Sequence, residues 1–547
     1  MPLDIRIDRG RICTGLHAAD GAWLHHGQPS SVGVRGGKIV TDITPDTPAK
    51  RIIDATDCIV CPGFIDIHAH SDYAALYAPA ALSKVMAGYT TELNGNCGYG
   101  AFPLAGPMKQ HRQEEYERYG LTVDWDDVDG YFRRCRREPM ALNQGLLIGH
   151  GTLRGSVMGL EGGRADRTQI RTMQRQVERV MRAGCFGMST GLVYAPGSSA
   201  APDEIEALAK VVAQHGGVYA SHLRSESDSL LEALDEFLAA CEQTRCRAQY
   251  SHIKTAGPRN WAKLGEVRKR LDRARDGGVE VFADRYPYIA SNTDLPTILL
   301  PNAALGGGRP AIIKRLTDPR PRKELKRAII ERERINEDGD GWFDRVTISA
   351  VRHDDLRPAQ GLTLRQWAEH TGNTDVLDAA FDLLIADGLL TQGIHFSMSE
   401  DNLRQILSWP DVMIGSDSSL RDELGDACCD RPHPRAFGTP ARILGQCVRD
   451  KQWLDVETAI HKMTGLPAHV MRLADRGVIR NDYWADLVVF DPRKIEDRAT
   501  YQDPATPPDG IKWVLVNGQL VVSSNGSLQA HPTCATPAPG KLLEFTG

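Results

Sequence analysis

Apolar residues recur at spacings of three and four through the middle of the chain, and short apolar runs separate these stretches. The spacing predicts amphipathic helices at residues 167–184, 203–216 and 229–244. The intervening runs predict strands at 143–151, 185–190, 217–223 and 247–254. Repeated strand–helix units of this length favour a parallel sheet, and eight such units would close a barrel.

The two ends of the chain have a different pattern. Short β-elements separated by Gly-rich turns fill the first sixty residues, at 3–12, 31–40 and 51–60. Strand-like runs return at 485–492 and 511–522. The second run contains Asn517-Gly518, a pair typical of a hairpin turn. We therefore expect both ends of the chain to build one small sheet domain.

These patterns predict an α/β protein of three parts. A (β/α)8 TIM barrel occupies residues 63–475, and a small β-sandwich-like domain combines residues 1–62 with 476–547. Residues 300–345 are rich in Gly, Pro and charge, which indicates an insertion or small subdomain on the barrel. Two ordinary surface helices fit this segment equally well.

The composition of the chain limits the classes of protein to which it can belong. The chain has 547 residues, 41% hydrophobic and 25% charged, with a formal net charge of -6. The acidic balance and the absence of a Lys/Arg run argue against nucleic-acid binding. The N-terminus lacks a signal-peptide layout, and no apolar run reaches about 18 residues, so we expect neither export nor a membrane span. Twelve scattered cysteines then favour reduced thiols in the cytoplasm. Cys58 and Cys61 have no matching second pair, so they are interpreted as structural.

The candidate chemistry begins at the end of a buried run. In "PGFIDIHAH", residues 62–70, His68 and His70 follow apolar residues. Successive side chains of a strand alternate between its faces, so these two imidazoles point the same way. Two converging imidazoles in a buried setting suit a metal ion.

Four more polar residues end predicted strands. They are Cys97, His222, His252 and Asp417. Strand ends of a parallel barrel meet at one face, where active sites lie, and thiolate, imidazole and carboxylate are all zinc ligands. Taken singly, a strand-end His is more often a core residue, a buried Cys a small hydrophobe, and a strand-end Asp a helix cap. The ordered set favours a metal site. His150, another strand-end histidine, is interpreted as a neighbour of the site or of the substrate.

Several motifs together resemble a known family. "PGFIDIHAH" is similar to the opening strand of the amidohydrolase superfamily. "NGNCG", "STGLVYAPG", "SHLRSE", "SHIK", "YPY" and "RPHPRAFGT" resemble its D-aminoacylase branch, the N-acyl-D-amino-acid deacylases, and "ADLVVFDP" resembles that family's C-terminal β-domain. The resemblance covers residues 30–525 and implies a distorted barrel that carries zinc.

The resemblance also implies roles for particular residues. Cys97, His222 and His252 would hold a tight zinc ion. His68 and His70 would hold a second, weaker metal position, with Asp417 beside them as a ligand and proton-transfer group. The substrate, a small N-acyl-D-amino acid, would be cleaved at its amide into a carboxylic acid and a D-amino acid. Its carbonyl and carboxylate would be contacted by Tyr194, Lys254, Tyr286 and Arg435.

Two positions depart from the family pattern, and other functions stay open. A long stretch before "HPR" makes Arg421 an alternative to Arg435, and Glu92 stands where an apolar residue is usual. Glu92 is either an extra ligand or, as we expect, a side-facing carboxylate. The alternative reactions are hydrolysis of cyclic amides, as in hydantoinases and dihydroorotases, and deamination. A barrel without catalytic activity would be expected to have lost ligands, and this chain has every expected type.

Overall fold

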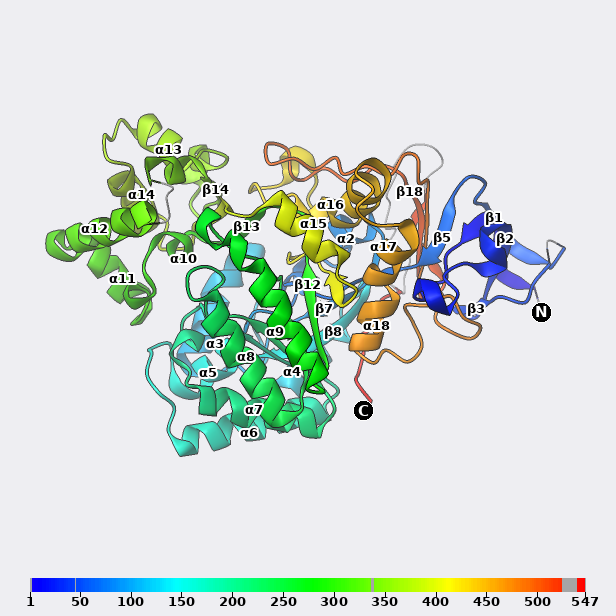
Figure 1. Cartoon of the computed structure of the whole chain (residues 1–547), viewed down its shortest axis with the longest axis horizontal. Coiled ribbons are helices and arrows are strands. Elements are labelled where there is room, and N and C mark those ends of the chain that lie inside the picture. The colour runs from blue at the N-terminus through cyan, green and yellow to red at the C-terminus, as the bar shows by residue number, and fades with distance from the viewer. Residues whose placement is uncertain (1, 45, 336–338, 524–538, 547) are drawn as a thin grey trace.

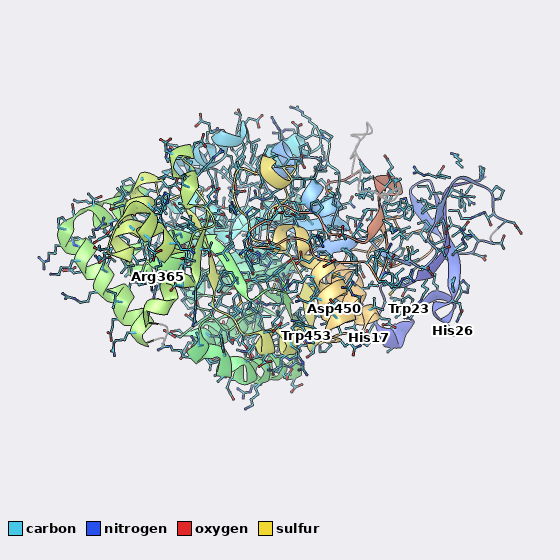
Figure 2. The ribbon with its side chains drawn as sticks, turned by 90° about the horizontal axis from the view of Figure 1, so that it is seen from above. His17, Trp23, His26, Arg365, Asp450 and Trp453 are labelled. Atoms are coloured by element: carbon cyan, nitrogen blue, oxygen red, sulfur yellow. The ribbon has the colours of Figure 1, made fainter. Side chains whose placement is uncertain are left out.

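The computed structural model describes residues 2–44, 46–335, 339–523 and 539–546. A strand-and-helix barrel occupies the middle of the molecule, a β-sheet lies at one end, and a mostly helical lobe lies at the other (Figure 1). Figure 2 shows the same length from above, with Arg365 in the helical lobe and His17, Trp23 and His26 toward the opposite end.

Eight parallel strands form the barrel. In order around it they are β6 (Phe64–Asp66), β7 (Tyr89–Asn94), β8 (Asn143–Gly149), β9 (Gly187–Gly191), β10 (Val218–His222), β11 (Arg247–Tyr250), β12 (Val281–Arg285) and β16 (Val412–Ile414). The first and last strands meet through a parallel bridge between Ala69 and Ser418, just beyond their carboxyl ends. The predicted (β/α)8 barrel is confirmed, and its closure brings the ends of β6 and β16 together.

The predicted helices are also present. They are α6 (Arg167–Arg182), α7 (Pro202–Gln214) and α8 (Leu230–Thr244). Helix α6 begins at a capping box in which Asp166 accepts from the N–H of Gln169 and the Gln169 side chain accepts from the N–H of Asp166. Its apolar stripe, which includes Val177 and Val180, packs into the core around the barrel. Within the described ranges, the structure contains no helix long and apolar enough to cross a membrane.

The sheet at the end of the molecule joins both ends of the chain. Its central strand β1 (Leu3–Ile12) pairs with β2 (Pro29–Arg35), β4 (Ala49–Asp54) and β5 (Ile59–Pro62). On the other side β5 pairs with β17 (Leu487–Phe490), which leads to β18 (Ile511–Val516) and β19 (Gln519–Ser523). The predicted hairpin turn lies between the last two, with Asn517 and Gly518 both at positive φ. A β-sheet made from both chain ends is confirmed, and the domain bounds 1–62 and 476–547 stay a prediction.

The helical lobe interrupts the barrel between β12 and β16. A three-stranded antiparallel sheet forms its base, from β13 (Ala290–Asp294), β14 (Val346–Ala350) and β15 (Gln392–Phe396). Its helices are α10 (Leu295–Leu299), α11 (Gly308–Thr317), α12 (Pro319–Ile335), α13 (Leu364–Thr371) and α14 (Val376–Ala386). The lobe has its own apolar core, which includes Leu299, Ile348 and Phe381. Residues 300–335 and 339–345, the described parts of the segment singled out in the sequence, lie inside it.

The last described residues run along the barrel. Gln144, at the start of β8, donates its N–H to the carbonyl of Lys541 and accepts from the N–H of Leu543. Phe545 donates its N–H to Gly184 and packs against Phe186. The tail therefore covers the amino end of the barrel strands, opposite to the end where the predicted site residues gather.

Candidate metal centre

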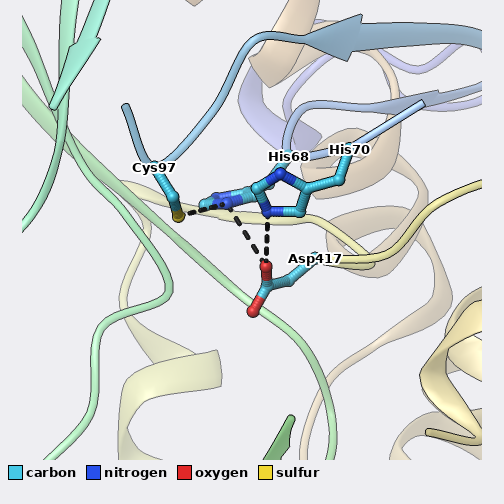
Figure 3. A group of neighbouring side chains, drawn as sticks. All are labelled: His68, His70, Cys97 and Asp417. Carbon is cyan, nitrogen blue, oxygen red and sulfur yellow. Dashed lines mark hydrogen bonds and ion pairs between the residues drawn. The ribbon is translucent and has the colours of Figure 1, made fainter. Parts of the chain in front are cut away.

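The six predicted metal ligands converge at the carboxyl ends of the barrel strands. They form two groups of donor atoms, each within 4.8 Å: His68, His70, Cys97 and Asp417 in one, and Cys97, His222 and His252 in the other. Figure 3 shows the first group, with both imidazoles turned toward the Asp417 carboxylate and the Cys97 sulfur close to His68. Cys97 belongs to both groups, so the two sets of donors share one thiol.

His68 and His70 follow β6 and point the same way, as the alternation predicts. The Asp417 Oδ1 atom lies 3.4 Å from His68 Nε2 and 3.0 Å from His70 Nε2. On its other side His68 Nδ1 lies 3.0 Å from Asp284, which belongs to β12 and accepts from that ring. This contact turns His68 Nε2 toward Cys97, 3.3 Å away. A carboxylate behind a histidine in this way fixes the tautomer that a metal needs.

The "NGNCG" loop after β7 delivers Cys97. Its glycines Gly95 and Gly98 have φ of 80° and 74°, a region that side-chain-bearing residues rarely adopt. A Cβ on Gly98 would lie 2.7 Å from the backbone nitrogen of Gly191, at the end of β9. The loop therefore needs glycine at this position both for its turn and for its close approach to the neighbouring strand.

Three of the six ligand candidates have strained backbones. Cys97, His252 and Asp417 have φ of 51°, 38° and 52°. Residues other than glycine in this region cost on the order of 1–3 kcal/mol each, and they concentrate at functional sites. The strain places these three side chains toward a common centre at the expense of local stability.

His222 is the last residue of β10, and His252 follows the end of β11. The His252 Nε2 atom lies 3.3 Å from Cys97 Sγ. Its Nδ1 atom lies 2.7 Å from Lys254 Nζ and 3.0 Å from Glu226. Glu226 also forms an ion pair with Lys254 and lies 3.6 Å from His222. One carboxylate thus holds both histidines and the lysine in place.

The donor set suits a metal ion. Burial would raise the pKa of the Cys97 thiol, but the imidazoles of His68 and His252 lower it well below its usual range. Burial lowers the pKa of His222, which favours the neutral imidazole that binds metals. Its buried Nδ1 atom has no hydrogen-bond partner among the described residues. A thiolate among histidines favours zinc over magnesium or calcium.

Asp417 lies between the donor groups and the cationic side chain of Arg435. Its Oδ2 atom lies 2.8 Å from Arg435 Nη1, in the first turn of α16 (Arg435–Arg442). Burial would raise the pKa of the Asp417 carboxyl, but Arg435 and, after it, His68 and His252 hold it well below its usual range. The carboxylate is therefore ionised and able to accept a proton.

A cavity of about 420 Å³ opens beside these groups, and all four predicted substrate contacts line it. The Arg435 guanidinium lies 4.5 Å above the ring centre of Tyr286, whose buried hydroxyl has no hydrogen-bond partner in the described part of the chain. Tyr194 contacts Thr293 through its hydroxyl, at 3.0 Å, and its ring meets that of His222 edge-on. Lys254 is buried beside the ligand candidate His252.

The two arginines that the sequence left as alternatives differ in their partners. Both line the cavity. Arg421 makes a two-pronged ion pair with Asp430, at 2.6 and 2.9 Å, which occupies its guanidinium. Arg435 instead reaches the metal-ligand candidate Asp417, and its Nε atom has no hydrogen-bond partner among the residues described. The geometry favours Arg435 as the group nearer the reaction.

Glu92 faces a buried lysine and belongs to neither donor group. Lys84, on α2 (Leu82–Val85), lies 3.2 Å from Glu92, 2.6 Å from Asp66 and 2.7 Å from Ser416. Asp66 in turn accepts from the backbone N–H groups of Ser416 and His68. This ionic cluster fastens the ends of β6 and β16 together directly below the candidate centre.

His150 lies outside the cavity. It pairs with Glu204 at 2.8 Å, and Arg154 contacts the same carboxylate at 3.0 Å. All three side chains are buried. His150 is not among the residues that line the cavity, which favours its interpretation as a neighbour of the site over that as a substrate contact.

Sequence reasoning missed two carboxylates that orient the candidate ligands. Asp284 accepts from His68 and from the backbone N–H of His252. Glu226 contacts His222, His252 and Lys254. Glu226 stands inside the "SHLRSE" motif, and Asp284 lies two residues before the "YPY" motif. A buried carboxylate next to a strand end was the available signal for both.

Comparisons with known proteins give a consistent family. A model of the amidohydrolase family matches residues 51–319 and 357–522. An N-acyl-D-glutamate deacylase of Alcaligenes xylosoxydans xylosoxydans is 33% identical, over 99% of this chain and 96% of that protein. A D-aminoacylase of the same organism is 31% identical, over 95% of this chain and 94% of that protein. The crystal structure of an N-acyl-D-glutamate deacylase from Bordetella bronchiseptica, complexed with zinc and a phosphonate mimic of the tetrahedral intermediate, superposes with a TM-score of 0.81 at 32% identity, covering all of both chains.

Proposed function

We propose that this chain, which belongs to the amidohydrolase family, is a zinc-dependent enzyme that hydrolyses the amide bond of N-acyl-D-amino acids. The products are a carboxylic acid and a free D-amino acid. The observation that carries the proposal is the Cys97 thiol, shared by two groups of metal donors beside a cavity with buried cations. The relatives, at 31–33% identity over nearly the whole chain, support the reaction and the D preference.

Cys97, His222 and His252 would hold a tight zinc ion, and His68 and His70 a second, weaker one. Zinc, when bound, supplies the Lewis acidity that makes water a nucleophile near neutral pH and polarises a carbonyl. Asp284 and Glu226 hold three of the ligand rings in the required orientation. Their contribution is to fix the site before substrate arrives.

Asp417 would act as the proton-transfer residue. Its carboxylate lies within 3.4 Å of both His68 and His70, and it is ionised. It would accept a proton as water attacks the amide and donate that proton to the leaving nitrogen. One carboxylate serves both steps because each step restores the protonation state that the other needs.

Arg435, Lys254 and Tyr286 would bind the α-carboxylate of the substrate, and Tyr194 would lie near its carbonyl. The planar Arg435 fork meets a carboxylate through two hydrogen bonds, and the unpartnered Tyr286 hydroxyl adds a donor. In the structure the Arg435 guanidinium forms an ion pair with Asp417. Fixing one end of the substrate in this way positions its amide for attack and lowers the activation barrier by several kcal/mol.

The role of Arg435 is tested by replacing it with methionine. Arg435→Met should cost about 2–5 kcal/mol in kcat/KM toward free-acid substrates, the scale for truncating a buried charge pair. It should cost far less toward the matching carboxamides, which have no charge to bind. Comparing the two losses cancels any effect on Asp417, because that effect is common to both substrates. Equal losses would make Arg435 structural and would return the role to Arg421.

The reaction itself is tested with a panel of N-acetyl-D- and N-acetyl-L-amino acids, together with hydantoin and dihydroorotate. The zinc-loaded protein should release free amino acid from members of the D series. Ring opening of the cyclic amides without turnover of any linear substrate would contradict the proposal.

The described cysteines are all free thiols, which agrees with a cytoplasmic location.

A further inference from the structure

The cavity has a roof supplied by the helical lobe. Residues of all three strands of its sheet line the cavity: Ser291, Asn292, Thr293 and Asp294 from β13, Ser349 and Ala350 from β14, and Gln392 from β15. The carbonyl of Asn292 accepts from Arg435 at 3.4 Å, and its side-chain oxygen accepts from Ser349 at 2.9 Å. The roof is thus joined to the proposed carboxylate-binding arginine.

Four lysine and arginine side chains line this cavity, and three of them already face a carboxylate. Lys254 pairs with Glu226, Arg421 with Asp430, and Arg435 with Asp417. The fourth is Arg352, two residues beyond β14. It is half-buried, and no carboxylate in the described part of the chain forms an ion pair with it. Arg352 is therefore the one of these four cations at which an incoming anion would displace no ion pair seen among the described residues.

The backbone holds Arg352 in place. Its N–H donates to Asp387 Oδ1 at 2.7 Å, and the N–H of His353 donates to the same oxygen at 3.0 Å. Asp387 is fully buried and also accepts from the Thr391 hydroxyl, at 2.7 Å. The start of the arginine side chain is therefore fixed at the cavity wall. A fixed backbone at this point lowers the part of the entropy cost of ligand binding that comes from ordering the loop.

The acidic groups of the cavity wall have other contacts. Glu115 pairs with Arg112 at 2.6 Å, and Asp422 accepts from the N–H groups of Ala80 and Leu82. Asp294 is hydrogen-bonded by Tyr99. Glu423 is exposed at the rim. Each of the first three has its own partner, so they leave Arg352 unpaired.

We propose that Arg352 binds the side-chain carboxylate of an acidic D-amino acid, so that the preferred substrates are N-acyl-D-glutamate and N-acyl-D-aspartate. The inference rests on the proposed function. An N-acyl amino acid has one negative charge at its α-carboxylate, which Arg435 and Lys254 serve. A second negative charge on the amino-acid part exists only where its side chain is acidic. A second cation on the same cavity fits that charge.

The test uses pairs of substrates that differ only in the side-chain charge. N-acetyl-D-glutamate is compared with N-acetyl-D-glutamine, and N-acetyl-D-aspartate with N-acetyl-D-asparagine, on the zinc-loaded enzyme. The wild type should prefer the acid in kcat/KM. Arg352→Met should lower kcat/KM for the acids by about 10- to 100-fold, the scale of one charge-assisted hydrogen bond, and leave the amides nearly unchanged. Arg352→Lys should restore part of the preference.

Arg357→Met is the matched control. Arg357 lies five residues further along the same segment and pairs on the surface with Asp354. This variant should keep the acid preference of the wild type. Equal losses on acids and amides in Arg352→Met, or a wild type that prefers neutral side chains, would overturn the inference while the deacylase activity stands. A zinc-loaded wild type that cleaves none of the four substrates, and no other N-acyl-D-amino acid, would instead refute the proposed function.

Discussion

Cys97→Ala should lose the tightly bound zinc and lower kcat/KM by about a thousandfold or more. The thiol is the donor common to both ligand groups, so its removal leaves each group one ligand short. The lost activity corresponds to the several kcal/mol that a metal supplies to a hydrolytic transition state. Elemental analysis of the purified variant measures the zinc, and circular dichroism establishes that it remains folded.

A variant of a second cysteine tests whether the loss of zinc is specific to Cys97 or follows from removing any buried thiol. Cys241, on α8, is fully buried in the core and far from the donor groups in the fold. Cys241→Ala should keep its zinc and its activity. Full zinc content in Cys97→Ala would show that the ligand assignment is wrong.

Asp417→Asn should lower kcat by at least about a hundredfold while the tight zinc remains. The amide has nearly the shape of the carboxylate but accepts no proton at neutral pH, and a general acid–base group contributes on this scale. Asp417 belongs to the donor group of His68 and His70, so the three ligands Cys97, His222 and His252 stay intact. Steady-state kinetics on an N-acetyl-D-amino acid, with zinc analysis of the same preparation, measures both effects.

Glu423→Gln is the control for a change of charge at the cavity. Glu423 lines the cavity but is exposed at its rim. Its neutralisation should leave kcat close to that of the wild type. A near-normal kcat in Asp417→Asn would assign the proton transfer to another group.

Periodicity in the sequence was enough to predict a parallel barrel and the face at which the candidate ligands gather. The helices α6, α7 and α8 were predicted because each has a continuous apolar stripe over several turns. The ligand candidates were identifiable because each ends a strand, and a parallel barrel brings strand ends to one face. The converging donor groups in the structure follow from that rule.

Contacts between distant segments were not predictable in the same way. The roof sheet pairs β13 with β15, about a hundred residues apart in the chain, and no local pattern encodes that pairing. The buried position of Lys84 depends on Asp66, Glu92 and Ser416, which come from three different strands or strand ends. The preference for Arg435 over Arg421 depends on the ion pair of Arg421 with Asp430, whose position only the folded loop defines.

The most direct test of the account compares the two enantiomers of one substrate with and without zinc. The protein is stripped of metal with a chelator, and release of free amino acid from N-acetyl-D-glutamate and N-acetyl-L-glutamate is measured before and after addition of zinc. We predict no release from either enantiomer without metal, and release from the D enantiomer alone once about one equivalent of zinc is restored. Equal activity with and without zinc, or cleavage of the L enantiomer in preference to the D, would contradict the account.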